Sequence, residues 1–145
     1  MLFRSVAITY VNLGRYEDAL ASHERSLEWK RKTGDKHGEQ ISLNNIGIVY
    51  QLLGQYERAI EHYEKGLVIC QQIDERRGTA ILLSGLAEAW KSLDDPKRAL
   101  GYARRQLEIA RDLGLRHFEA EGLYRAAESE EALGAGECRP TIGMR

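Results

Sequence analysis

Hydrophobic residues along this chain are spaced three and four apart, and the pattern returns every 40 positions. Spacing of this kind places apolar side chains on one face of a helix. A fixed period of this length indicates one supersecondary unit that stacks on copies of itself. Residues 40 positions apart are similar, and each such set is called a column. The columns are Leu13, Leu53, Leu93 and Leu133; Ala7, Gly47, Ala87 and Ala127; Tyr10, Tyr50 and Trp90; Ala19, Ala59 and Ala99; and Leu27, Leu67 and Leu107.

The same pattern predicts pairs of helices joined by short turns. Gly14 and Gly54 each follow an apolar helical stretch, where a glycine commonly ends a helix. At the equivalent junction of the third unit the chain reads Asp94-Asp95-Pro96, in which the aspartate can cap the next helix and the proline can occupy its first turn. We expect repeats at about 1–34, 35–74 and 75–114, a capping helix at 116–133 and a disordered tail at 134–145.

The columns also predict which side chains face inward. On the second helix we expect His23, Leu27 and Trp29 on the inner face, with the histidine as a packing residue. On the capping helix we expect Leu123 to face inward. Glu130 fills the aromatic column of that helix, and a polar residue there suits a face that no second helix covers.

Composition and charge mainly exclude some classes of partner and location. Hydrophobic residues make up 43% of the chain and charged residues 30%, as in ordinary soluble helical proteins. The net charge of -1 argues against a nucleic acid as partner, since such binding rests on a basic surplus. No apolar run reaches the roughly 18 residues of a membrane span. Cys70 and Cys138 lack metal-type spacing, and we expect a reducing, cytoplasmic setting.

Motifs of catalysis are missing from the sequence. There is no HExxH, no GxSxG and no glycine-rich phosphate loop. Cys70 has no base beside it in sequence and is interpreted as a structural thiol. The acidic run from Glu128 to Glu131 points its carboxylates in different directions around a helix, which favours a solvated face over a metal site. We therefore expect no enzymatic activity, no cofactor and no metal.

These columns resemble the tetratricopeptide repeat, whose pattern is W-x2-L-G-x2-Y followed by A-x3-F in about 34 residues. The matching segments are Leu43-x2-Ile46-Gly47-x2-Tyr50 and Ala59-x3-Tyr63. The units here are about six residues longer, a form similar to the repeats of kinesin light chains, spindle-orientation adaptors and bacterial regulatory proteins. The resemblance covers 1–133. It implies an all-α, right-handed superhelical solenoid of three repeats and a capping helix, with the first helix of each repeat along a concave face.

The resemblance further implies that partners bind on this concave face. Asn44 and Asn45 are the most suggestive pair, because amides can hydrogen-bond the backbone of an extended peptide. The alternative for Asn45 is a hydrogen bond to a neighbouring helix end. Glu88 and Glu128 make one end acidic, so we expect a partner with apolar anchors and basic residues. The expected groove residues are Arg4, Ile8, Ile41, Asn44, Asn45, Ile48, Gln51, Ser84, Glu88, Lys91, Tyr124, Arg125 and Glu128.

The function expected is a protein–protein interaction module or scaffold that binds a peptide or helical segment of a partner. Two alternatives remain open at this point. The chain could be the regulatory or sensor domain of a larger signalling or transcription protein, which the uncapped start of its first helix favours. It could also be a self-associating structural unit, a homodimer through the apolar edge of Leu2, Phe3 and Val6.

Overall fold

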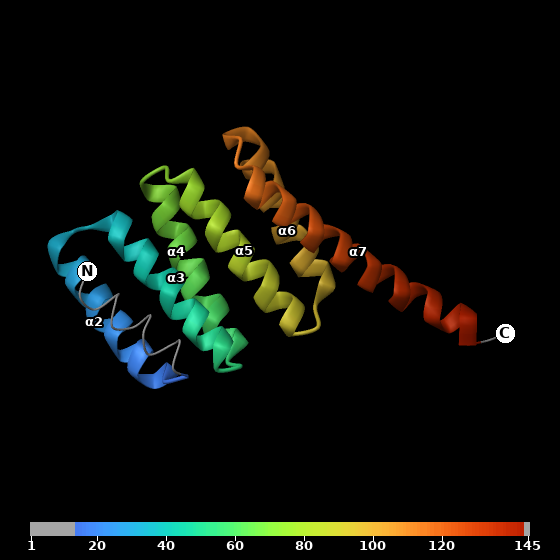
Figure 1. Ribbon diagram of the computed structural model, residues 1–145, viewed down its shortest axis with the longest axis horizontal. Helices are drawn as coiled ribbons and strands as arrows, with labels where there is room; N and C mark the ends of the chain where they lie inside the picture. Colours follow the sequence, from blue (N-terminus) through green and yellow to red (C-terminus); the bar gives the residue numbers. More distant parts are fainter. Residues whose placement is uncertain (1–13, 144–145) are drawn as a thin grey trace.

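Residues 14–143 are described in a computed structural model, with side chains for residues 14–134. This part of the chain contains six α-helices and no strand. The predicted first helix, and with it Arg4 and Ile8, lies outside the described residues. The helices are α2 (Tyr16–Thr33), α3 (Lys36–Leu52), α4 (Tyr56–Gln72), α5 (Arg76–Ser92), α6 (Pro96–Leu113) and α7 (Arg116–Gly143) (Figure 1).

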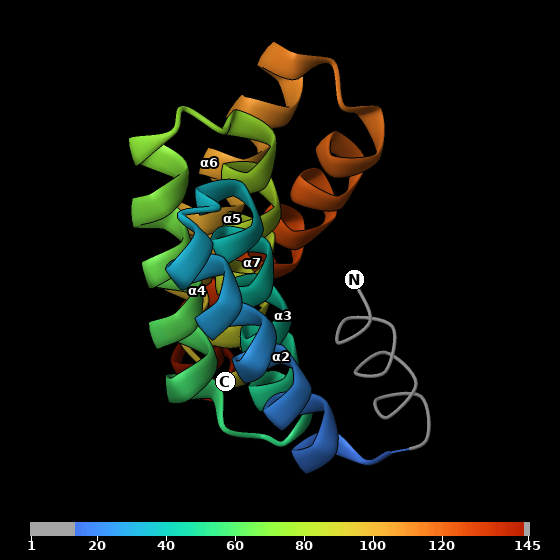
Figure 2. The same ribbon diagram turned by 90° about the vertical axis from the view of Figure 1, so that its left-hand side faces the viewer.

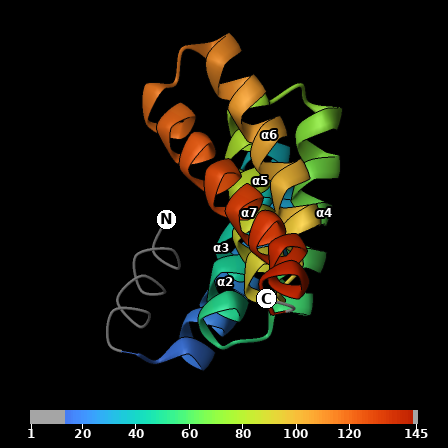
Figure 3. The ribbon, with the colours of Figure 1, turned by 90° about the vertical axis from the view of Figure 1, so that its right-hand side faces the viewer.

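Consecutive helices pack side by side in chain order, so that each is held by its neighbours in sequence (Figure 1). The first helices of the repeats also touch one another, α3 with α5 and α5 with α7. Seen from either end of the stack, α4 and α6 lie on one side and α3 and α5 on the other, with α7 crossing obliquely (Figures 2 and 3). The predicted all-α solenoid is confirmed.

The turns between helices depend on residues in the left-handed backbone region. Gly34, Gly54 and Gly114 adopt φ of 70°, 75° and 67°, a conformation that glycine takes at no steric cost. At the equivalent places in the 40-residue period stand Asp74 and Asp94, with φ of 55° and 60°. Aspartate is one of the few other residues that tolerate this region. The turn chemistry therefore differs between repeats while the backbone path is kept.

The junction before α6 is built as the sequence predicts. The Asp95 carboxylate accepts a hydrogen bond from the Arg98 backbone N–H at 3.1 Å, and Pro96 is the first residue of the helix. Proline suits that position because its missing N–H has no partner in the first turn. Asp35 caps α3 in the same way, accepting from the Gly38 N–H at 2.9 Å.

The core runs through the middle of the stack, where first and second helices meet. Tyr63 of α4 is 1% exposed and its ring lies against Gly47 of α3 and Gly85 of α5. A Cβ added at these glycines would meet the Tyr63 ring at 2.5 Å and 2.8 Å. The two glycines therefore make the room that this ring occupies, and Leu82 and other apolar side chains close the core around it.

Three expectations for local structure are wrong. Trp29 is 62% exposed rather than inward, because residues two apart lie about 200° apart around a helix and Leu27 takes the inner face. Leu123 is 46% exposed, since no described helix packs on the outer side of α7. The last helix does not end near 133 but continues to Gly143. Gly134 lacks the left-handed φ that ends α2 and α6, so it does not stop the helix.

Candidate functional site

An open pocket of about 460 Å³ lies on the face formed by the first helices of the repeats. Its walls come from α3 and α5, its ends from the start of α4 and from α7. Its size lies within the range of about 300–1,000 Å³ typical of ligand sites. The lining residues are Asn44, Ile48, Gln51, Leu52, Tyr56, Tyr63, Ile81, Ser84, Gly85, Glu88, Ser92, Glu121 and Arg125.

One part of the pocket is apolar. Ile48 and Leu52 of α3 are 42% and 49% exposed and stand one helical turn apart. Ile81 of α5 and Tyr56 of α4 face the same space. These side chains leave an apolar surface open to a ligand at the α3 side of the pocket.

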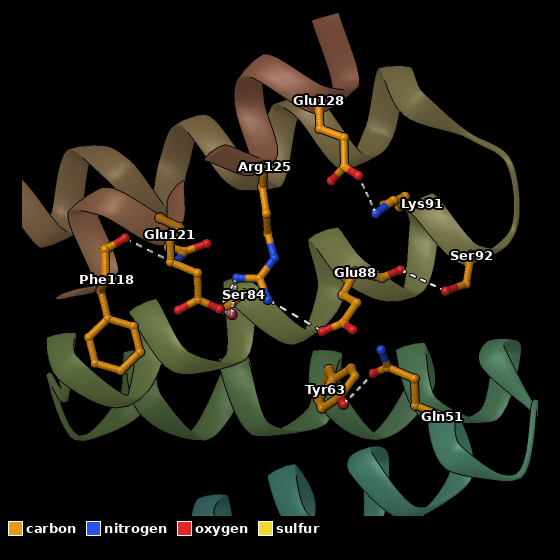
Figure 4. A network of polar contacts seen from close by, with 11 residues as sticks. Gln51, Tyr63, Ser84, Glu88, Lys91, Ser92, Phe118, Glu121, Arg125 and Glu128 are labelled. Carbon is orange, nitrogen blue, oxygen red and sulfur yellow. Dashed lines mark hydrogen bonds and ion pairs between the residues drawn. The ribbon is translucent and has the colours of Figure 1, made fainter. Parts of the chain in front are cut away.

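The floor of the pocket carries a polar atom from the core. The Tyr63 hydroxyl donates a hydrogen bond to the Gln51 side-chain oxygen at 2.8 Å (Figure 4). Burial raises the pKa of Tyr63 well above its ordinary value, and the nearby Glu88 carboxylate raises it further. The hydroxyl therefore stays protonated at neutral pH and holds the Gln51 amide in place.

A charged cluster joins α5 and α7 at the other side of the pocket (Figure 4). The Arg125 guanidinium donates to the Ser84 hydroxyl at 2.6 Å and to the Glu88 carboxylate at 3.3 Å, and it pairs with Glu121 one turn earlier. Ser84 donates to Glu121 at 3.1 Å. The Arg125 side chain is only 17% exposed, whereas that of Glu88 is 54% exposed. Two carboxylates against one guanidinium leave one net negative charge beside the apolar surface.

Lys91 and Glu128 form a second link between α5 and α7, with 2.7 Å between the Lys91 ammonium nitrogen and a Glu128 carboxylate oxygen (Figure 4). They line a separate, smaller cavity of about 280 Å³ beside Asp94 and Pro96. The negative charge expected at Glu128 is therefore balanced by Lys91, and the acidic character of the main pocket rests on Glu88 and Glu121.

Apart from Lys91 and Glu128, the predicted groove residues that the structure describes divide into two groups. Asn44, Ile48, Gln51, Ser84, Glu88 and Arg125 are brought together in the pocket. Ile41 and Asn45 are half-buried and Tyr124 is 69% exposed, and none of them lines it. The side chain of Asn45 makes no hydrogen bond to another described residue, so the helix-end alternative has no support in this part of the chain.

Sequence reasoning missed several lining residues, and a simple signal identifies them. Contacts between neighbouring first helices join residues 37 apart, as in Ser84–Glu121, Glu88–Arg125 and Lys91–Glu128. The same offset leads from Asn44 to Ile81 and from Ile48 to Gly85, which the prediction left out. The offset is three residues less than one repeat, because neighbouring first helices face each other with different sides. Leu52, Tyr56, Tyr63 and Ser92 were also missed.

The Cys70 thiol and groups of possible metal ligands are the side chains that bear on covalent and metal chemistry. Cys70 is 1% exposed, and burial raises its pKa to about 11, so the thiolate nucleophile is scarce at neutral pH. Among the described residues no group of three or more His, Cys, Asp or Glu side chains could hold a metal ion. In the same part of the chain, no helix has the length and apolar character needed to cross a bilayer. What the pocket offers is apolar surface, amides and charge.

Comparison with known proteins gives a consistent result. The family model described as the tetratricopeptide repeat matches residues 1–67 and again 38–112. Comparison with curated protein sequences gives no match. Among solved structures, the apo form of RapI is 27% identical, with a TM-score of 0.74 over 81% of this chain and 42% of that one. The chain thus spans less than half of the length of RapI.

Two further structures show the same fold at lower identity. The TPR domain of Arabidopsis FLU is 19% identical, with a TM-score of 0.71 over 76% of this chain and 92% of that one. Nearly identical TPR-like repeats assigned to a kinesin light chain of P. anserina are 19% identical, with a TM-score of 0.65 over 97% of this chain and 73% of that one. Repeats of this kind generally mediate protein–protein interactions and have no catalysis of their own. With matches across residues 1–112, the chain belongs to the tetratricopeptide repeat family.

Proposed function

We propose that the protein is an interaction module that binds a peptide or helical segment of a partner protein in the pocket along α3, α5 and α7, without catalysis of its own. The observation that carries this proposal is the combination, in one hollow, of exposed aliphatic side chains with the Asn44 amide, which makes no hydrogen bond to another described residue. Ile48 and Leu52 offer apolar contact, and such contact provides most of the affinity of peptide grooves.

The polar lining supports an extended or helical peptide rather than a small apolar ligand. The Asn44 side chain lines the pocket and makes no hydrogen bond to another described residue, so its donors and its acceptor are open to a ligand backbone. The half-exposed Glu88 carboxylate has only the 3.3 Å contact with Arg125 and can accept further bonds. A basic side chain of the partner fits there, next to apolar anchors on Ile48 and Leu52.

The setting that we propose is the cytoplasm of the source cell. The one described cysteine, Cys70, is a free thiol, and reduced thiols are the rule in that compartment.

The proposal is tested by affinity capture from a lysate of the source cell with two matched variants. Asn44→Ala and Asn45→Ala make the same chemical change at adjacent, half-buried positions, but only Asn44 lines the pocket. We expect a partner captured by the wild type to be reduced with Asn44→Ala and retained with Asn45→Ala. Equal capture by all three proteins contradicts the proposal. If the only protein captured were another copy of this chain, the result would indicate self-association instead.

A further inference from the structure

Gly101 stands in the middle of α6 on its exposed side. Glycine is among the poorest residues for the interior of a helix, and it is usually kept there for close packing. Here no packing requires it, because a Cβ added at Gly101 would meet no atom within 4 Å. The glycine therefore leaves open space on the surface of α6.

The space is a shallow hollow of about 310 Å³ lined by Arg98, Gly101, Tyr102 and Arg105. Both guanidinium groups rest on aromatic rings, Arg98 at 4.5 Å from the centre of the Trp90 ring and Arg105 at 6.0 Å from that of Tyr102. Arg98 has a contact of 3.6 Å with Asp95, while Arg105 makes no ion pair with another described side chain. Two ordered cations thus border the hollow, and no carboxylate lines it.

The preceding repeat shows what occupies the equivalent place. Forty residues earlier, Arg58 and Lys65 stand where Arg98 and Arg105 stand in α6, and Arg58 lies over the Tyr50 ring at 5.8 Å. Between them is Glu61 in place of Gly101, and its carboxylate pairs with Lys65 at 3.2 Å. The third repeat has the two cations and the aromatic ring under the first of them, but it has a glycine where the preceding repeat has the Glu61 carboxylate.

We propose that this hollow binds an aspartate or glutamate side chain from an acidic segment of a partner protein, whose carboxylate takes the place that Glu61 has in α4. The missing side chain at Gly101 provides the room, and Arg98 and Arg105 provide two guanidinium groups with the planar geometry that a carboxylate prefers. The occupant is a protein segment because the Tyr102 ring also lines the hollow and extends the contact beyond the charge.

The site is separate from the pocket of the first helices. It lies on α6, which forms the opposite side of the stack with α4 (Figure 3). The two proposals therefore predict different partner chemistry: basic and apolar in the pocket of α3, α5 and α7, and acidic on α6.

The test uses a phage-displayed library of short random peptides. Selection on the wild type is carried out with an excess of soluble Gly101→Glu protein, which removes peptides that bind the α3–α5–α7 pocket because that pocket is the same in both proteins. We expect the remaining peptides to share an Asp or Glu. In fluorescence anisotropy, such a peptide should bind Gly101→Glu and Arg105→Gln about tenfold more weakly than the wild type, and more weakly as salt is added.

Lys65→Gln serves as the matched control, because it removes the equivalent cation in the preceding repeat and should leave binding unchanged. Gly101→Glu should melt at or above the temperature of the wild type, since glutamate is the better helix former and can pair with Arg105. Three results would overturn the proposal: no peptide that separates wild type from Gly101→Glu, selected peptides without an acidic residue, or full binding by Arg105→Gln.

Discussion

Replacement of Gly47 by alanine tests whether the Tyr63 ring fixes the distance between α3 and α4. The added Cβ would lie 2.5 Å from Tyr63 Cε1, closer than carbon atoms approach in proteins. The ring cannot turn away freely, because Gly85 of α5 also lies against it, and an added Cβ there would meet the ring at 2.8 Å. The helices must therefore move apart or the ring must leave its place.

The expected magnitude follows from two opposing effects. Overpacking of a core site costs about 1–3 kcal/mol. Alanine in place of glycine in a helix interior contributes about 1 kcal/mol of stability. Gly101→Ala makes the same change where the new Cβ meets nothing within 4 Å, so it should show the favourable effect alone. We expect Gly47→Ala to be less stable than Gly101→Ala by about 1–3 kcal/mol, which corresponds to several degrees in melting temperature.

Urea denaturation followed by circular dichroism measures this difference, provided that the slope with denaturant is the same for both variants. A double-mutant cycle with Tyr63→Leu then identifies the cause. In the Tyr63→Leu background, which itself is destabilised, Gly47→Ala should become neutral or stabilising. If Gly47→Ala were as stable as Gly101→Ala in the otherwise wild-type protein, the packing role assigned to the two glycines would be refuted.

Three further predictions concern the turns, the buried thiol and the α5–α7 link. Asp94→Gly should stabilise the fold by up to about 1 kcal/mol, because φ is 60° at this residue and glycine adopts that value without strain. Asp95→Ala should cost about 1 kcal/mol, because it removes the cap of α6, so thermal melts of the two variants should shift in opposite directions. Burial raises the pKa of Cys70 to about 11, so the contribution of this thiol to stability should be constant below about pH 8.5 and be lost as the pH rises toward 11. Urea midpoints at about pH 8 and toward about pH 11, with Cys70→Ala showing a flatter dependence, would test this. Arg125→Gln should cost about 1–2 kcal/mol of stability and speed amide exchange in α7, whereas Lys91→Gln should cost less than about 1 kcal/mol, because the Arg125 side chain is more buried than that of Lys91. Equal effects of the two substitutions would contradict this reasoning.

The helices and turns could be predicted because they depend on local and periodic features. The columns that contain Gly47, Ala59 and Leu67 recur at one interval, and one helix pair explains each copy. Asp94 could be placed in a turn because it shares a column with Gly54, and Asp95 and Pro96 follow it with capping chemistry. Such signals need no knowledge of how one repeat sits on the next.

The pocket was predicted only in part because its geometry depends on how neighbouring repeats pack on one another. The column positions place Asn44, Ile48 and Glu88 on the first helices, but the 37-residue offset that brings Glu88 to Arg125 is a property of packing. Tyr63 was missed because it belongs to a second helix, and its ring reaches the pocket beside Gly85 of α5. Column positions predict which face of a helix a side chain lies on, whereas the contacts between helices can be read only from the structure.

The most direct test of the proposed function is the affinity of one partner peptide for a pair of matched surface variants. The peptide is the segment of a captured partner that binds the wild type in fluorescence anisotropy. Ile48→Glu places a charge on an exposed aliphatic position inside the pocket, and Val68→Glu places it on one outside the pocket, on α4. We predict a loss of about tenfold or more in affinity for Ile48→Glu and none for Val68→Glu. Unchanged binding by Ile48→Glu, or an equal loss in both, would contradict the assignment of the pocket.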